Sequence, residues 1–444
     1  MGNFKVGFSR IDITPMMGIE ISGYFKTRIA DEVLDLLYAN AIAFECGKKK
    51  ALMICVDNCG INQKILLTYR KMISEKLEIG VDKVFISCTH THTGPSITSQ
   101  SDIAEQYRNQ LGEKLVKVAI DAVNDLKTAK MGYGIGNAPN IAFVRRFRMM
   151  DGSIKTNPGV DNPDIVAPIG DIDERVNVLR FDRENADTVV LVNFGCHPDV
   201  VGGCKISADW PGFVRITVEK VLDNTKCIFF NGAEGDINHV NVHPRGGFLN
   251  GMFKDFDDVS RGYAHAQYMG RVIAGGVLQA FDKVKYVDVN EISAVNRVMN
   301  VPSNKPDAKD LPEAYRIKEI HESGRDDELP YKGMMLTTVV AEALRMVRLE
   351  NAADAFDMTL SGIKLGPVVL VGIPGEPFNG IGRGIKDTDG YELILPIACA
   401  NGYEGYFPMR DSYDEGGYEA RSSNFRAGVA EFIIEEGKKM LNGL

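Results

Sequence analysis

The sequence predicts an α/β fold, and two observations carry that prediction. Short apolar runs rich in β-branched residues alternate along the chain with amphipathic segments of helical period. The composition, with 44% hydrophobic and 25% charged residues, is that of a soluble globular protein. At 444 residues the chain is long enough for one elaborated domain or for two.

The elements follow from these patterns in order. Continuous apolar runs indicate strands buried on both faces, and apolar positions spaced three and four apart indicate helices with one buried face. Strands are expected at residues 5–14, 39–46, 50–56, 83–88, 176–181, 189–194, 226–230 and 367–373, and helices at 62–77, 102–126, 210–222, 331–348 and 424–441. The Gly/Pro-rich residues 138–171 and 241–258 are expected to be long loops, which in enzymes often form lids or binding walls.

Charge and hydropathy exclude several partners. The net charge is −9, from 51 basic and 60 acidic residues, and the basic residues are scattered, so no nucleic acid or anionic membrane is expected as a partner. No apolar stretch reaches the roughly 18 residues of a transmembrane segment. The first residues lack the apolar core of a signal peptide, so a cytoplasmic location is the default, with a secreted form whose signal was removed left open. Cys55, Cys88, Cys227 and Cys399 lie in apolar surroundings that suit reduced core residues.

Histidines and one glutamate follow three predicted strands. His90 and His92, two of only seven histidines, come directly after residues 84–88. His197 follows residues 188–194, and Glu376 follows residues 367–373. Open α/β sheets place their sites at the carboxyl ends of strands. Two or three imidazoles with one carboxylate form a catalytic zinc set that leaves a position for water.

Each of these residues also has a structural explanation. Glu376, before Pro377, could be a charge at a helix N-terminus. His197 could be a hydrogen-bonded core histidine, and the pair His90 and His92 could be hydrogen-bonded loop residues. The coincidence of three strand ends favours a metal site.

Several motifs then resemble the neutral (non-lysosomal) ceramidases, in the family's order over most of the chain. The matching segments are residues 89–95 (THTHTGP), 193–198 (NFGCHP), 235–236 (GD), 374–376 (PGE), 401–406 (NGYEGY) and 417–419 (GYE). Each is short, and together they are specific. The resemblance implies one domain over residues 1–444 built on a mixed sheet, without the carboxyl-terminal β-domain of the secreted enzymes. The high charge of residues 303–352 indicates a surface insertion in this domain.

The resemblance also implies a ligand set for one Zn²⁺ ion. In the family the metal is held by two histidines, a glutamate and a tyrosine. Tyr403 and Tyr406 compete for the tyrosine position, and the family spacing to a second functional tyrosine favours Tyr406 with Tyr418 following it. Either tyrosine could instead pack on the core with its hydroxyl hydrogen-bonded. The implied ligands are His90, His197, Glu376 and Tyr406.

Three further residues are implied to act on the substrate. His92 corresponds to a histidine beside the reaction centre, Tyr418 to a tyrosine that binds the substrate amide and the oxyanion, and Arg145 to an arginine with the same task. The family's Asn-Arg pair is Val144-Arg145 here. Arg146 could therefore take the role, and either arginine could be a solvated surface residue.

The sequence departs from the family at Asn238, which stands where the ceramidases have a serine regarded as the nucleophile. An amide side chain cannot attack a carbonyl, although it can hydrogen-bond substrate or water. This favours attack by metal-activated water, with His92 or a carboxylate as proton acceptor. With the shorter chain, it puts ceramide itself in doubt.

The leading hypothesis is a zinc-dependent hydrolase that cleaves the amide bond of an N-acylated substrate, either ceramide or a smaller polar analogue. The alternatives are a metal-containing binding protein of the same fold, motivated by Asn238, and a zinc esterase or other hydrolase. A (β/α)8 amidohydrolase is disfavoured by the β-rich start and irregular loops. Acyl-chain length and oligomeric state are not encoded in any recognisable pattern.

Overall fold

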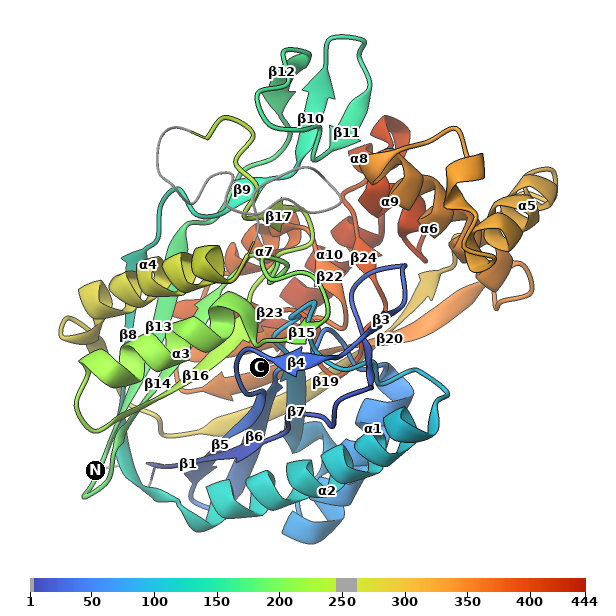
Figure 1. Ribbon diagram of the computed structural model, residues 1–444. Helices are drawn as coiled ribbons and strands as arrows, with labels where there is room; N and C mark the ends of the chain where they lie inside the picture. Colours follow the sequence, from blue (N-terminus) through green and yellow to red (C-terminus); the bar gives the residue numbers. More distant parts are fainter. Residues whose placement is uncertain (1–3, 245–261) are drawn as a thin grey trace.

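The computed structural model describes residues 4–244 and 262–444, and its largest sheet there has nine strands (Figure 1). Their order is β16-β14-β13-β8-β1-β5-β6-β7, with β18 beside β8. The pairs β6/β7 and β14/β16 are parallel and the others antiparallel, which confirms the expected mixed sheet. The strands are β1 (Phe4–Asp12), β5 (Tyr38–Cys46), β6 (Lys49–Val56), β7 (Val84–Cys88), β8 (Lys127–Asn137), β13 (Arg175–Arg183), β14 (Thr188–Phe194), β16 (Thr225–Asn231) and β18 (Lys285–Val287).

A second sheet packs on one face of the first. It has the order β19-β20-β21-β23, with β21 parallel to β23. Side chains from both sheets, among them Phe44 and Phe181 from the first and Leu370 and Leu395 from the second, share one buried apolar core. The strands are β19 (Ile292–Pro302), β20 (Ala355–Leu365), β21 (Val368–Gly372) and β23 (Leu393–Ile397).

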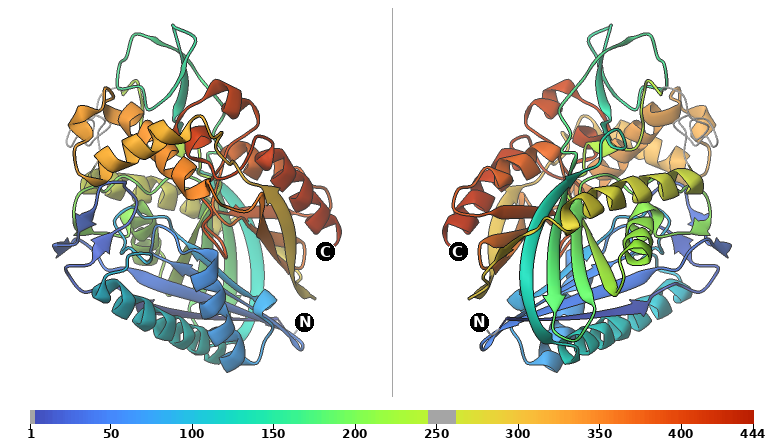
Figure 2. Two further views of the ribbon diagram at one scale, coloured as in Figure 1. Left: turned by 90° about the vertical axis from the view of Figure 1, so that its right-hand side faces the viewer. Right: turned by 90° about the vertical axis from the view of Figure 1, so that its left-hand side faces the viewer.

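Helices cover the outer faces of both sheets and complete four layers (Figure 2). Helices α1 and α2 cover the half of the nine-stranded sheet that contains β5, β6 and β7. Helices α3 and α4 cover the half that contains β13, β14 and β16, while α7 and α10 cover the four-stranded sheet. Because both faces of the nine-stranded sheet are covered, even its last strand, β7, is buried along its whole length and is apolar except for Ser87. The helices are α1 (Gln63–Leu77), α2 (Asp102–Asn124), α3 (Asp209–Val221), α4 (Tyr263–Phe281), α7 (Asn379–Lys386) and α10 (Val429–Asn442).

The charged residues 303–352 contain two helices with a small apolar core of their own, which includes Ile317 and Val340. α6 confirms the helix expected at residues 331–348, and it packs against α9 beside the candidate site. Arg421 of α9 pairs with Glu342 of α6. The elements are α5 (Leu311–Glu322), the 3-10 turn η2 (Asp326–Glu328), α6 (Gly333–Leu349), α8 (Asp411–Glu415) and α9 (Tyr418–Ser422).

Two expectations were wrong in detail. Residues 138–171, predicted as a loop, contain β9 (Phe143–Val144), β10 (Arg146–Met149), β11 (Ile154–Thr156) and β12 (Ile165–Pro168), strands of two to four residues that are too short to show a period. The helix predicted at 424–441 begins only at Val429, after Gly428 at φ 98°. Of the second predicted loop, 241–258, residues 245–258 lie outside the described residues.

Two-residue strands tie the loops together over the carboxyl ends of the main strands. They are β9, given above, and β2 (Glu20–Ile21), β3 (Arg28–Ile29), β4 (Glu32–Val33), β15 (Lys205–Ile206), β17 (Ile237–Asn238), β22 (Glu376–Pro377) and β24 (Tyr406–Phe407). The 3-10 turn η1 (Val81–Lys83) precedes β7. None of the helices among the described residues has the length and apolarity to cross a bilayer. All eight cysteines are free, as expected of reduced residues.

Candidate metal centre

The candidate site lies where the carboxyl ends of strands from both sheets meet. β7 leads to His90 and His92, β14 to His197, and β21 to Glu376 on β22. Asn231, at the end of β16, links the first two loops, since its amide donates to Thr89 O and to Cys196 O. The strand ends that carried the sequence-based hypothesis are therefore adjacent in the fold.

Two imidazoles face one carboxylate at the centre of this region. The Nε2 atoms of His197 and His90 lie 3.0 Å and 3.4 Å from Glu376 Oε2. The two rings are 4.9 Å apart between centroids, and all three side chains are 1% exposed. The structure thus brings together three of the four residues expected to bind metal.

Backbone carbonyls hold the opposite nitrogen of each ring. His90 Nδ1 lies 2.7 Å from Cys59 O, and His197 Nδ1 lies 2.8 Å from Glu234 O. A carbonyl can only accept, so each Nδ1 carries a proton and each Nε2 presents a lone pair toward Glu376 when the ring is neutral. Glu376 Oε2 is itself buried without a hydrogen bond of good geometry among the described residues. Two Nε2 lone pairs and one Glu376 oxygen therefore converge, and a positive charge between them is needed to offset their mutual repulsion.

The pKa shifts that burial and neighbouring charges cause in the cluster agree with this need. Burial disfavours charge on His90, but nearby Cys59 and Glu376 raise its pKa well above the ordinary value. Burial opposes ionisation of Glu376, and His90 with His197 nevertheless keeps the pKa of that carboxyl well below its usual range. Burial, with Arg145, lowers the pKa of His197. A single proton on His90 or one bound cation would satisfy the cluster, and metal binding would displace that proton.

Both candidate tyrosines reach the cluster. Tyr403 donates from its hydroxyl to Glu376 Oε1 at 2.6 Å. The Tyr406 hydroxyl lies 3.3 Å from His197 Nε2, and its ring stacks on His197 with centroids 6.2 Å apart. Tyr406 is paired with Glu376 in register through β22 and β24. Tyr403 therefore supports the carboxylate, whereas Tyr406 points at the nitrogen that faces it.

His92 and Arg145 flank the cluster. His92 Nε2 lies 3.2 Å from His90 Nε2, and burial lowers the pKa of His92 well below its ordinary value. Arg145 donates to Glu419 Oε1 at 2.6 Å and to Gly235 O at 2.8 Å, with its guanidinium over the Tyr406 ring.

The other predicted residues are placed as follows. The Tyr418 ring lies 5.5 Å from that of Tyr406, and burial raises the Tyr418 pKa, so its hydroxyl keeps its proton. Arg146 instead binds Ser412 and Glu415 near α8, so Arg145 is the arginine beside the cluster. Asn238 is buried and uses both ends of its amide locally, donating to Asn157 Oδ1 and accepting from Val240 N.

Two acidic residues near the cluster were missed by the sequence analysis. Glu234 is fully buried, its pKa is raised by burial, and it can form a ligand group with His90 and Cys399. Asp199 lies beside His92. The sequence did offer a signal for both, because Glu234 and Asp199 each lie next to a recognised motif, in a loop that follows a strand.

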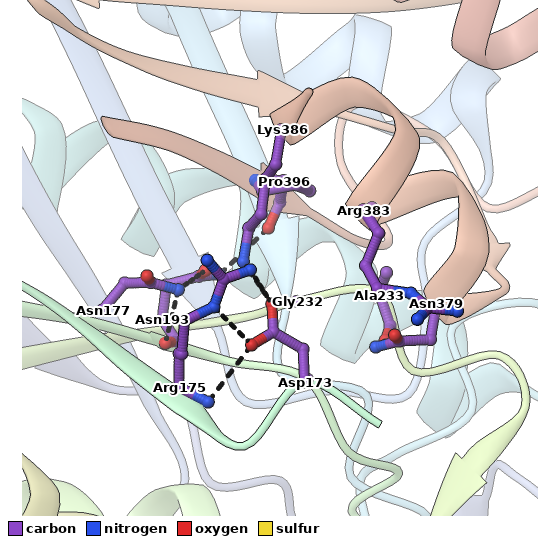
Figure 3. Close-up of a pocket in the computed structure, with 12 residues that line it drawn as sticks. Asp173, Arg175, Asn177, Asn193, Gly232, Ala233, Asn379, Arg383, Lys386 and Pro396 are labelled. Atoms are coloured by element: carbon purple, nitrogen blue, oxygen red, sulfur yellow. Dashed lines mark hydrogen bonds and ion pairs between the residues drawn. The ribbon is translucent and has the colours of Figure 1, made fainter. Parts of the chain in front are cut away.

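A small cavity lies behind the loops that follow β14 and β16 (Figure 3). Its volume is about 20 Å³, which is room for roughly one water molecule. Asp173 is held there by Arg175 and Lys386, at 2.7 Å and 2.8 Å. These ion pairs occupy the space that a ligand would need, so this cavity is a structural feature and not a substrate pocket.

Comparison with known proteins bears on the fold. No family model matches the sequence. Among solved structures, neutral ceramidase from Pseudomonas aeruginosa is similar with a TM-score of 0.74 and 16% identity, over 100% of this chain and 75% of that one. The chain has a ceramidase-like fold. A ceramidase complexed with C2 is similar with a TM-score of 0.71 and 17% identity, over 99% of this chain and 75% of that one. The fold implied by the sequence motifs is confirmed.

Proposed function

We propose that this protein is a zinc-dependent hydrolase that cleaves the amide bond of an N-acylated substrate. The observation that carries the proposal is the convergence of two imidazole nitrogens and one carboxylate oxygen in a buried site. Backbone carbonyls already hold both Nδ1 atoms, an arrangement typical of metal-binding histidines. The donor chemistry therefore fits a bound cation.

The proposed ligands are His90, His197, Glu376 and Tyr406. Two nitrogens with oxygen donors suit zinc, although other transition ions accept the same set. A zinc ion at this position would polarise a substrate carbonyl and make water more acidic. The Sγ atoms of Cys59 and Cys399 lie 3.8 Å and 3.7 Å from His90 Nδ1, the nitrogen that faces away from Glu376, so neither thiol belongs to the proposed set.

The remaining side chains have separable tasks. His92 is neutral because of burial, so its ring is able to accept a proton from the attacking water. Tyr418 keeps its hydroxyl proton and can donate a hydrogen bond to the oxyanion that forms from the substrate carbonyl. Arg145 adds a positive charge beside Tyr406. Because Asn238 cannot act as a nucleophile, water attacks the carbonyl carbon, and the proton it loses leaves on the amine when the C–N bond breaks.

The substrate class follows from the ceramidase-like fold and from the motifs shared with that family. The proposed substrates are ceramides and smaller N-acyl amines. The test is amine release from a panel of short-chain and long-chain N-acyl compounds, with matching esters, by protein stripped of metal and then reloaded with zinc. We expect zinc-dependent amide cleavage and a loss of about 100-fold or more in His92→Ala. Ester cleavage alone would replace the proposal with a zinc esterase.

A metal-containing binding protein is the second candidate, and the hydrogen-bonded Asn238 amide favours it. It predicts that an N-acyl ligand binds the zinc-loaded protein and is recovered unchanged. Isothermal titration with a short-chain ceramide, followed by mass spectrometry of the recovered ligand, separates the two functions. Folded, zinc-loaded protein that binds every ligand and cleaves none would overturn the hydrolase proposal.

A further inference from the structure

An acidic side chain faces the nitrogen of His92 that points away from the metal centre. Asp199 Oδ1 lies 3.5 Å from His92 Nδ1, and both side chains are largely buried, with exposed fractions of 13% and 10%. His92 Nδ1 is fully buried and has no hydrogen bond of good geometry among the described residues. Tyr24 donates to the same Asp199 oxygen at 2.6 Å. The Tyr24 phenol, the Asp199 carboxylate and the buried His92 imidazole thus form a partly buried row that ends at the candidate site.

The His92 ring is held in place by the short hairpin of β2 and β3. Gly23, at φ 110°, presses on the ring so closely that a Cβ there would lie 2.7 Å from His92 Cγ. Arg28 donates to His92 O at 2.6 Å, and its guanidinium lies 4.0 Å from the centre of the Tyr24 ring. These contacts restrict the imidazole to an orientation with Nε2 toward His90 and Nδ1 toward Asp199.

The loop that carries Asp199 is also held in place by hydrogen bonds. It comes two residues after His197, and the next two backbone amides, of Val200 and Val201, both donate to Asp209 Oδ2 at 2.9 Å. Asp209 is buried at the start of α3. The loop that carries Asp199 is therefore anchored to a helix as well as to the proposed metal ligand.

We propose that Asp199 is a positioning residue that holds a proton on His92 Nδ1, leaving the Nε2 lone pair directed at the candidate metal centre. A carboxylate opposite Nδ1 selects this tautomer, because only a protonated nitrogen interacts favourably with it. The 3.5 Å separation fits a catalytic contact that shortens when substrate binds.

The inference rests on the proposed hydrolase function, since the tautomer matters for a base. In the reaction the attacking water gives its proton to His92 Nε2 as its oxygen bonds to the carbonyl carbon. The imidazolium formed is balanced by the Asp199 carboxylate. The same proton then passes from Nε2 to the amine nitrogen as the C–N bond breaks, which returns His92 to its neutral form.

The test compares Asp199→Ala and the isosteric Asp199→Asn with wild type, all loaded with zinc. We expect kcat to fall about 10- to 100-fold while KM changes less than about threefold, because loss of an orienting partner misplaces the base without removing it. Zinc content should stay equal to wild type. Unchanged kcat in both variants, or zinc loss that matches the loss of kcat, would overturn the proposal.

A second readout does not depend on activity. In ¹⁵N-histidine-labelled protein, assigned with His92→Gln, the His92 signals should show the Nδ1–H tautomer in wild type and lose it in Asp199→Ala. The matched control is Asp161→Ala, which removes a carboxylate 3.4 Å from His243 Nδ1 in an exposed pair and should leave both kcat and the His92 signals unchanged. If no substrate is cleaved but the tautomer responds as expected, the hydrolase function fails and the positioning role stands. A His92 tautomer unaffected by Asp199→Ala refutes the positioning role whatever the activity.

Discussion

His197 offers the sharpest test of the metal centre, because its two ring nitrogens have different partners. His197→Ala removes the Nε2 atom that lies 3.0 Å from Glu376 Oε2. It also removes the Nδ1–H group that donates to Glu234 O. We expect wild-type protein to bind about one zinc ion per chain and the variant to bind far less, since removing a direct ligand should cost at least the 10- to 100-fold in affinity that loss of a supporting partner costs.

The magnitude can be worked through binding linkage. With free zinc at 100 times the wild-type Kd, binding stabilises the folded protein by about 2.7 kcal/mol, and a 10- to 100-fold weaker site gives only about 1.4 to 0.4 kcal/mol. A chain of 444 residues has an unfolding entropy of about 0.9 kcal/mol per kelvin. Zinc should therefore raise the Tm of wild type by about 3 °C and that of the variant by about 1.5 °C or less.

The assay is elemental analysis together with calorimetric unfolding, each with zinc and with a chelator. The matched control is His321→Ala on α5, whose ring contacts Asp326 at 2.9 Å and takes no part in the cluster. It should keep both the zinc content and the Tm response of wild type. Equal zinc in His197→Ala and wild type, or no zinc in either after reloading, would refute the reasoning from converging acceptors.

Three further predictions concern single positions. Because Asn238 cannot act as a nucleophile, intact-mass spectrometry during turnover of a slow N-acyl substrate should show no acylated protein, and such an adduct would contradict attack by water. Gly23→Ala places a methyl group against His92, so kcat should fall about 10-fold or more at unchanged zinc content, whereas unchanged kcat would show that the ring need not stay in place. Burial raises the pKa of Asp173, but its two cationic partners lower it below 3.8 overall, so its contribution to stability is complete above about pH 4 and lost as the pH falls further. Urea unfolding between pH 5 and pH 3 should therefore show a steeper loss of stability for wild type than for Asp173→Asn, and equal slopes would contradict it.

Much of the sheet framework could be predicted because its strands are buried on both faces. β7, β14 and β21 are mostly apolar and almost entirely buried, and this pattern can be recognised in the sequence without knowledge of the partner strands. β19 and β20 were not predicted. Both contain half-exposed polar positions, and their pairing over eleven residues depends on a partner more than fifty residues away. Cross-strand packing of this kind cannot be derived from local periodicity.

The candidate site was predictable to the extent that its residues follow the carboxyl ends of buried strands. His90, His197 and Glu376 each follow a strand that runs parallel to a neighbour. β7 and β14 are nevertheless far apart in the order of the nine-stranded sheet, and β21 belongs to the second sheet, so the meeting of the three residues depends on how the sheets pack. The choice between Tyr403 and Tyr406 was left to family spacing, because it depends on side-chain direction in a loop. Asp199 is a loop residue whose partner His92 lies more than a hundred positions earlier, and no sequence spacing encodes that contact.

The backbone around the proposed metal centre fixes the orientation of the His90 ring. His90, Cys399 and Asn401 all have left-handed backbone conformations, with φ of 73°, 48° and 57°, and such residues cost about 1–3 kcal/mol each. They persist because the two sheets hold them. Cys88 N donates to Cys399 O, and Asn401 bonds Ile86 through both its backbone and its side chain. His90 N donates to Asn58 O at 2.9 Å, so the turn that aims this ring is fixed by the adjoining loop. The strained backbone at the junction of the sheets thus holds the proposed ligands rigidly. Binding of a metal would then cost less conformational entropy, because the side chains are already ordered.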